Sequence, residues 1–185
     1  MDNINNKEKL YNQLVAAHGK IMYTYTAHHK MADRLISYSK LIKRIQIGLT
    51  GITSCGFLAL IIYDGTCLKI LGGLLSTISL CLNLYTKGNN FFNNEIKEHQ
   101  AAANDLWEIR EAYVALLTDF NVLPDVVIRE KRDELTARVS AVNRKYAGTD
   151  SSAYKEAQKA LKKQEEQTFN PGEAEKFLPV QLRKH

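Results

Sequence analysis

The sequence predicts an all-α membrane protein in which a two-helix transmembrane hairpin extends into a cytosolic antiparallel helical bundle. Two observations lead to this architecture. Residues 45–63 and 67–85 are apolar stretches of about 19 residues each, close to the length that a helix needs to cross a bilayer. Outside them the chain is polar and charged, and its apolar residues recur at the three- and four-residue steps of a helix face.

The connection between the two stretches favours a hairpin. The first stretch carries no formal charge, and the second carries only Lys69, near its start. Asp64 and Gly65 are turn residues, because Asp bonds its own backbone and Gly tolerates positive φ. In hydrocarbon every backbone polar group must be paired within the segment, and two helices joined by a tight turn satisfy this requirement. We therefore predict spans at 45–63 and 67–85.

A buried helical hairpin inside a soluble bundle is the alternative, and the mean hydropathy of −0.29 allows it. A core helix of a soluble protein normally keeps a charged outer face at helical spacing. Residues 45–63 have no such face. Their polar side chains are Gln46, Thr50, Thr53, Ser54 and Tyr63. The membrane interpretation is favoured.

The distribution of charge predicts an orientation. Lys40, Lys43 and Arg44 precede the first span, and Lys87 and Lys97 follow the second. The positive-inside rule therefore places both termini in the cytoplasm of a multi-pass inner-membrane protein. At the far interface Lys69 pairs plausibly with Asp64 as an anchor. The net charge of +5 and the pI of 9.0 are mild, and no basic run is dense enough to predict nucleic-acid binding.

The expected organisation has four parts. Residues 1–44 form an N-terminal helix continuous with the first span, 45–85 the hairpin, 86–168 the cytosolic helices and 169–185 a C-terminal tail. Phe91 and Phe92 are expected at the headgroup level, after an interfacial break over 86–90. Pro124 ends the next helix, because proline cannot continue the hydrogen-bond ladder. Ser151 or Ser152 is expected to cap a last helix.

The sequence contains no recognisable catalytic or metal motif. The five histidines never make the paired helical spacing of a zinc site, and His28 and His99 are expected to be ordinary hydrogen-bonded residues on packed faces. No phosphate-binding loop, nucleophile elbow or dinucleotide fingerprint occurs. Cys55, Cys67 and Cys81 are expected to be small apolar filler. We predict a protein that is not an enzyme and that needs no cofactor or metal.

A small-and-polar stripe follows the second span. It consists of Lys69, Gly72, Ser76, Ser79 and Asn83, at steps of three and four residues, and Thr50 and Thr53 lie in the first span. Small residues let helices approach closely, and hydroxyls or amides bond between helices, so the stripe is explained by packing within the hairpin. Packing is the commoner explanation for a two-helix hairpin, and the alternative is that the stripe lines a pore formed by several hairpins. A single hairpin encloses no lumen, so a pore requires a homo-oligomer.

The order of the segments resembles a known family. The hairpin is followed by EIKEHQAAANDLWEIREAYVALLTDF (95–120), PDVVIREKRDELTARVSAVNRKY (124–146), SSAYKEAQKALK (151–162) and FLP (177–179). This layout resembles the SLATT proteins, the SMODS- and SLOG-associating two-transmembrane effectors of prokaryotic conflict systems. The resemblance covers nearly the whole chain. It supplies no catalytic residue and no ligand-sensing residue.

The resemblance implies an antiphage-defence effector that oligomerises and permeabilises the inner membrane, in the manner of abortive infection. The implied partners are the lipid bilayer, further copies of the chain, and a cyclic nucleotide or a sensor or synthase protein as the trigger. The alternative is a membrane-anchored scaffold that does not permeate and whose cytosolic helices recruit a partner. The two readings differ in whether the purified protein makes liposomes leak.

Overall fold

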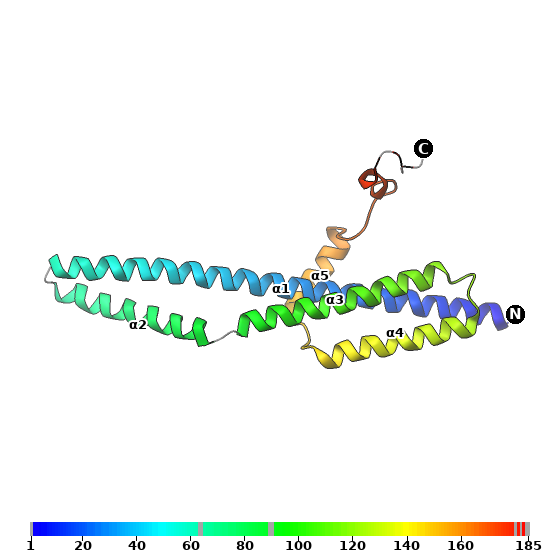
Figure 1. Cartoon of the computed structure of the whole chain (residues 1–185), viewed down its shortest axis with the longest axis horizontal. Coiled ribbons are helices and arrows are strands. Elements are labelled where there is room, and N and C mark those ends of the chain that lie inside the picture. Colours follow the sequence, from blue (N-terminus) through cyan, green and yellow to red (C-terminus); the bar gives the residue numbers. More distant parts are fainter. Residues whose placement is uncertain (1, 63–64, 89–90, 180, 182, 184–185) are drawn as a thin grey trace.

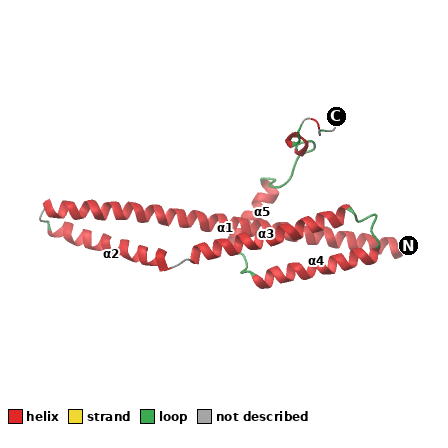
Figure 2. Cartoon of the chain, viewed as in Figure 1, coloured by secondary structure: helices red, strands yellow, loops and turns green. Residues whose placement is uncertain are grey.

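The computed structural model describes residues 2–62, 65–88, 91–179, 181 and 183, and the side chains of 6–56, 65–85, 92–179, 181 and 183 among them. These residues form five α helices and one short 3-10 helix, and no strand occurs in this part of the chain (Figures 1 and 2). The all-α prediction is confirmed. The elements are α1 (Asp2–Ile62), α2 (Thr66–Gly88), α3 (Phe91–Thr118), α4 (Asp125–Lys145), α5 (Ser151–Lys163) and η1 (Ala174–Phe177).

Helix α1 is the axis of the molecule. Its 61 residues contain no proline and extend over about 90 Å. Helix α2 runs back along the second half of α1, and α3 continues in the same direction along the first half (Figure 1). Helix α4 then returns beside α3. The molecule consequently has two regions, which we call the bundle (the first half of α1 with α3, α4 and α5) and the apolar arm (the second half of α1 with α2).

The hydrophobic core lies entirely in the bundle. It is formed by the periodic apolar residues of three helices: Leu10, Leu14 and Ile21 of α1, Leu106, Ile109, Tyr113 and Leu116 of α3, Phe120 just after it, and Ile128, Leu135 and Val142 of α4. Near the N-terminal end of α1, the ring of Tyr11 packs edge-on against Phe120, with ring centroids 5.3 Å apart. The periodicity seen in the sequence is thus the periodicity of this core.

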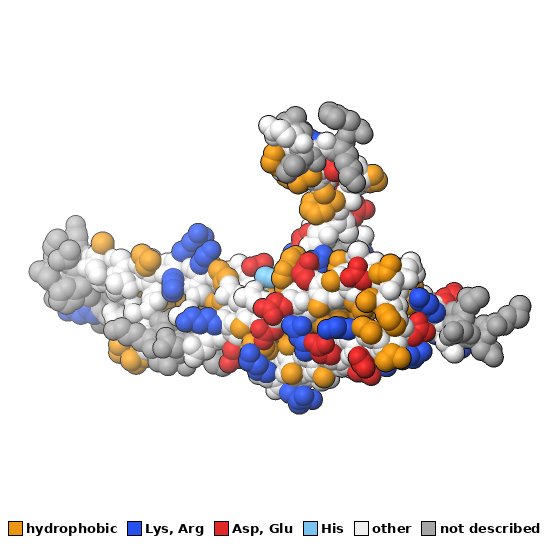
Figure 3. Space-filling model, turned by 45° about the vertical axis from the view of Figure 1, so that its right-hand side comes forward, with side chains coloured by type: hydrophobic (Ala, Val, Ile, Leu, Met, Phe, Trp, Pro, Cys, Tyr) orange, Lys and Arg blue, Asp and Glu red, His pale blue; other side chains and the backbone are white. Residues whose placement is uncertain are grey.

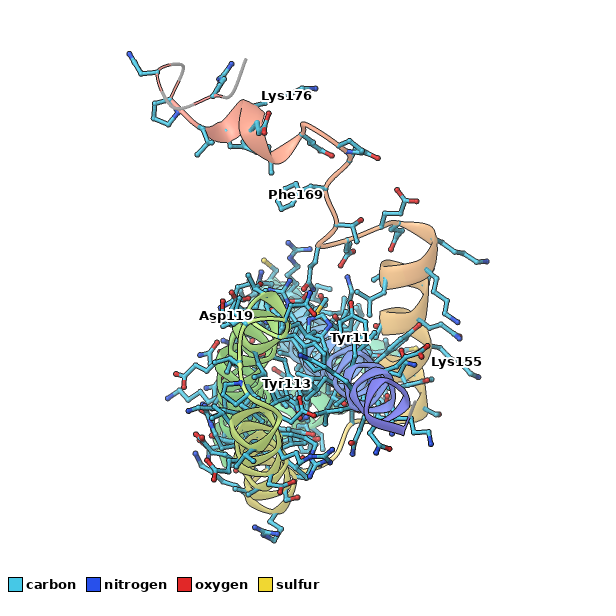
Figure 4. All side chains as sticks on the ribbon, turned by 90° about the vertical axis from the view of Figure 1, so that its right-hand side faces the viewer. Tyr11, Tyr113, Asp119, Lys155, Phe169 and Lys176 are labelled. Carbon is cyan, nitrogen blue, oxygen red and sulfur yellow. The ribbon has the colours of Figure 1, made fainter. Side chains whose placement is uncertain are left out.

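Helix α5 packs on α1 through an alanine face. Ala153, Ala157 and Ala160 are fully buried, and small side chains at this spacing let the two helix backbones approach closely. Figure 4 looks along the bundle from its N-terminal end and places α5 on one side of α1, with α3 and α4 on the other. The contact is bordered by the ion pair of Lys30 with Glu166, 2.9 Å.

The cap of α5 differs from the sequence prediction. Asp150, not Ser151 or Ser152, is the N-cap residue, and its Oδ1 accepts a hydrogen bond from the Ala153 amide at 2.7 Å. The other carboxylate oxygen accepts from Arg34, 2.5 Å away. This hydrogen bond, followed by that of the Ala153 amide, lowers the pKa of Asp150. A carboxylate is the better cap here because it neutralises Arg34 at the same time.

The chain leaves α5 as a projecting segment (Figure 1). Gly172 adopts a φ of +76° in the turn that precedes η1, a conformation that favours glycine. The rings of Phe169 and Phe177 contact each other edge-on at 6.2 Å, and both are largely exposed. Its first residues still contact α1, through the ion pair of Glu166 with Lys30 and a hydrogen bond from Gln167 to Thr26 at 3.4 Å, and beyond them Phe169 packs on Phe177 of the same segment.

Candidate functional site

The apolar arm presents an uncovered hydrophobic surface. Among the described residues, one helical segment is long and apolar enough to cross a membrane, Thr66–Tyr85, and only 6% of its residues are buried within the chain. Its exposed large side chains are Leu68, Ile70, Leu71, Leu74, Ile78, Leu80, Leu84 and Tyr85. The first predicted span lies in α1 and exposes Ile47 and Ile52, while its end from residue 57 has no described side chains.

The two helices of the arm meet along a narrow seam. The less exposed side chains of α2 are those of Leu75, Ser79, Leu82 and Asn83, and those of α1 are Ile42, Gln46, Leu49 and Thr53. The α1 set advances by steps of four, three and four residues, and in α2 Leu75, Leu82 and Asn83 lie four, three and four residues from Ser79, as in the packing of two nearly antiparallel helices. Ser79, 7% exposed, is the most deeply buried residue of the seam.

An amide pair joins the two helices inside the seam. The Nε2 of Gln46 donates a hydrogen bond to the Oδ1 of Asn83, and the Nδ2 of Asn83 donates to the Ser79 carbonyl at 3.0 Å. Asn83 belongs to the predicted stripe, but its pairing with Gln46 was not predicted. The signal was present in the sequence: Gln46 lies at the start of one span and Asn83 near the end of the other, positions that face each other in an antiparallel pair.

Hydroxyl groups in the arm bond to their own helices. Thr50 donates to the Gln46 carbonyl at 2.8 Å, Ser54 to the Thr50 carbonyl at 2.9 Å, and Thr77 to the Gly73 carbonyl at 2.9 Å. These bonds satisfy the hydroxyl hydrogens without water. Polar side chains of this kind are compatible with an apolar surrounding, whereas an unpaired hydroxyl is not.

The structure separates the predicted stripe into two sets. Ser79 and Asn83 face α1, and Gly72 and Thr53 are half-buried beside them. Lys69, Ser76 and Thr50 are exposed. Of the three predicted interface anchors, Asp64 lies outside the described residues, α3 begins at Phe91 with its side chain outside the described set, and Phe92 is half-buried.

The bundle contains a second polar pair between helices. His28 of α1 and His99 of α3 are 5% and 2% exposed, and their Nδ1 atoms are 2.9 Å apart. A hydrogen bond between these two atoms requires that one Nδ1 carries the proton and the other accepts it. Burial, followed by the neighbouring His99 and His29, lowers the pKa of His28 to about 4. Burial also lowers the pKa of His99, against the opposing effect of Glu95 and Glu98. The expectation of hydrogen-bonded histidines is confirmed.

Within the described part of the chain, no three histidine, cysteine, aspartate or glutamate side chains converge as metal ligands. Cys55, Cys67 and Cys81 are free thiols on exposed positions of the arm. The features that set this protein apart are therefore the uncovered arm, its polar seam and the bundle attached to it.

Comparison with known proteins identifies the family. A family model described as SMODS and SLOG-associating 2TM effector domain family 4 matches residues 10–173, which include most of α1 and all of α2 to α5. The resemblance drawn from the order of the segments is confirmed. Neither the comparison with curated proteins nor that with solved structures finds a match.

Proposed function

The chain belongs to the SMODS and SLOG-associating 2TM effector (SLATT) family, and on that premise we propose that it is a conflict-system effector that permeabilises the inner membrane. In this proposal the arm spans the bilayer as a two-helix hairpin, the bundle lies in the cytoplasm, and several copies assemble to form the path. The signal is a nucleotide or a partner protein that acts on the bundle.

The uncovered surface of α2 carries the proposal. In water each exposed leucine or isoleucine loses about 1.5–3 kcal/mol relative to burial, and α2 exposes most of its apolar residues. A bilayer removes this penalty, because the lipid tails themselves cover the side chains. The described α2 of 23 residues is about 35 Å long, enough for a hydrocarbon core of roughly 30 Å.

The charges around the arm support the orientation. Asp64 is the only acidic residue between Arg34 and Asn94, whereas Lys40, Lys43 and Arg44 lie just before the apolar part of α1. In the view of Figure 3, acidic side chains lie over the bundle, and Lys and Arg side chains lie where the bundle meets the arm. Basic side chains at this level favour contact with anionic headgroups of the cytoplasmic leaflet.

The water path needs polar groups that lie outside the seam. Ser79 and Asn83 face α1, so they serve the seam. Ser76 is exposed on α2, as is Lys69 near its start. We assign Ser76 to the path in the assembled protein and Lys69 to its outer mouth, where a long side chain reaches the headgroups.

Dye release from liposomes tests the proposal. The purified full-length protein is reconstituted, and release is compared for Ser76→Leu and for Ser54→Leu, a matched loss of an exposed hydroxyl on α1. We expect the protein to release dye, Ser76→Leu to slow release, and Ser54→Leu to leave it unchanged. Absence of leakage from well-inserted, oligomeric protein would instead support the scaffold that recruits a partner without permeation.

A further inference from the structure

A groove runs along α1 between α4 and α5. Its larger cavity has a volume of about 600 Å³ and is floored by Ala16 and Gly19 of α1, with Leu106 of α3 behind them. A smaller cavity of about 300 Å³ continues it under the connection between α4 and α5, toward His28. Thr24 and Asn143 line both cavities, so the two are adjacent. We call this feature the α4–α5 groove.

The groove is a consequence of how the bundle is packed. Helix α4 packs on α3 and α5 packs on α1, so the two helices border a strip of α1 that neither covers. Gly19 lies in this strip, and a Cβ atom built on it meets nothing within 4 Å. A glycine inside a helix costs about 1 kcal/mol relative to alanine, and close helix packing does not account for this one.

The lining of the groove combines one cation with two aromatic rings. Lys20 is the charged residue of the larger cavity, it forms no ion pair with the described residues, and no carboxylate lines either cavity. The rings of Tyr23 and Tyr154 stack at its border, with centroids 5.7 Å apart and an interplanar angle of 27°. The Asn143 amide also has no hydrogen-bond partner among the described side chains and backbone groups.

These groups define the chemistry of a ligand. An unpaired ammonium with no competing carboxylate selects an anion, the apolar floor and the tyrosine rings select a flat ring, and a free amide selects hydrogen-bonding ring edges. The volume lies within the range of small-molecule sites. We propose that the α4–α5 groove binds a small ligand in which a planar heteroaromatic ring carries an anionic group, as in a nucleoside monophosphate.

The inference rests on the proposed function in one respect, the arrival of a signal at the bundle. A ligand in the groove contacts α1, α4 and α5 together, so it would fix α5 relative to α4. Because α1 continues into the arm, the groove lies on the helix that joins the bundle to the membrane region.

Calorimetric titration of the full-length protein in detergent tests the site with three probes. 5′-AMP has both the ring and the anion, adenosine has the ring alone, and ribose 5-phosphate has the anion alone. We expect 5′-AMP to bind about tenfold or more tighter than adenosine, since a charge-assisted hydrogen bond contributes at least that factor. It should also bind tighter than ribose 5-phosphate, which lacks the ring that contacts the apolar floor and the tyrosines. Equal affinities for the three probes, or no binding of 5′-AMP, would overturn the proposal.

Two pairs of variants locate the binding. Gly19→Leu fills the floor of the groove, and Gly19→Ala is its matched control; both improve helix propensity, so neither is expected to unfold α1. Lys20→Gln removes the cation, and Lys155→Gln removes a lysine that points away from α1 in Figure 4. We expect weaker 5′-AMP binding for Gly19→Leu and Lys20→Gln, and wild-type binding for both controls.

The outcomes are separable from those of the proposed function. Equal effects of Lys20→Gln and Lys155→Gln would mean that 5′-AMP binds elsewhere, and this would refute the groove whatever the liposomes show. Conversely, binding of 5′-AMP in the groove without any dye release would support the ligand site and contradict the proposed permeabilisation of the membrane. Circular dichroism of each variant confirms that the helices are retained.

Discussion

The bundle and the apolar arm are built from the same helix, α1, yet they are held together by different means. In the bundle, leucine, isoleucine and tyrosine side chains meet in a core. Within it Leu14, Leu106 and Tyr113 are almost completely shielded from solvent. In the arm most large apolar side chains point outward, and the contact between the helices is a narrow seam in which Ser79 and the Gln46–Asn83 pair lie beside leucine and isoleucine side chains.

The proposed membrane setting of the arm accounts for this difference. In water, hiding apolar surface drives helices together, at about 25 cal/mol per Å². In lipid that gain vanishes, because the surrounding tails are as apolar as leucine, and close packing and hydrogen bonds remain to hold a helix pair. Polar side chains also pair between helices in both regions, for example His28 with His99 in the bundle and Gln46 with Asn83 in the arm.

Truncating one leucine in each region is expected to give the largest contrast. Leu106 is 1% exposed and Leu74 is 60% exposed. Leu106→Ala should lower the free energy of unfolding by about 2–5 kcal/mol, because it leaves a cavity in the core. Leu74→Ala should change it by less than about 0.5 kcal/mol. Denaturant unfolding in detergent, followed by circular dichroism, measures both, and similar losses would contradict the contrast.

Acid should weaken the bundle through its histidine pair. The pKa of His28 is about 4 in the folded protein, below its ordinary value of 6.5. The unfolded chain therefore takes up the proton first, and the free energy of unfolding falls as the pH drops from about 6.5 to 4, by roughly 3 kcal/mol. Above pH 6.5 this loss is absent.

Thermal unfolding in detergent at several pH values between 7 and 4 measures the effect. His28→Gln should show a shallower dependence over this range, because glutamine does not titrate. The Gln46 and Asn83 amides do not titrate either, so their pair adds nothing to the slope. An unchanged slope in His28→Gln would assign the acid sensitivity to other groups, such as His99, whose pKa is also lowered by burial.

The amide pair of the arm should show the smallest effect. A double-mutant cycle with Gln46→Leu and Asn83→Leu is expected to give a coupling energy of about 0.6 kcal/mol, typical of hydrogen bonds between membrane helices. Unfolding in detergent micelles supplies the four free energies. A coupling energy of zero would mean that the Gln46–Asn83 hydrogen bond does not stabilise the seam. A value far above about 2 kcal/mol would mean that this hydrogen bond dominates the stability of the arm.

Much of the fold was predictable from local patterns. The three- and four-residue steps predicted the helices, and Pro124 predicted the break that separates α3 from α4. The likeness to a family was predictable from the order of segments. The cap of α5 was misplaced by one or two residues, because Asp150, Ser151 and Ser152 are all good cap residues and the nearby Arg34 favours the carboxylate.

The α4–α5 groove and the amide pair were not predicted, because both depend on register between helices. A periodic pattern states which face of a helix is apolar, but not which residue of the next helix lies opposite. Lys20 looks like any surface lysine in the sequence. It becomes distinctive only once α4 and α5 border the strip of α1 on which it lies.

The continuity of α1 also fixes an angular relation along the molecule. An unbroken helix turns by about 100° per residue, so the azimuth of the groove at Gly19 determines the azimuth of the seam at Gln46. If α1 rotates or slides at the groove, its residues at the seam must move with it, because no loop lies between the two positions to absorb the change. Inserting a single residue between these positions would leave every local contact possible and yet turn the two faces about a quarter-circle out of step.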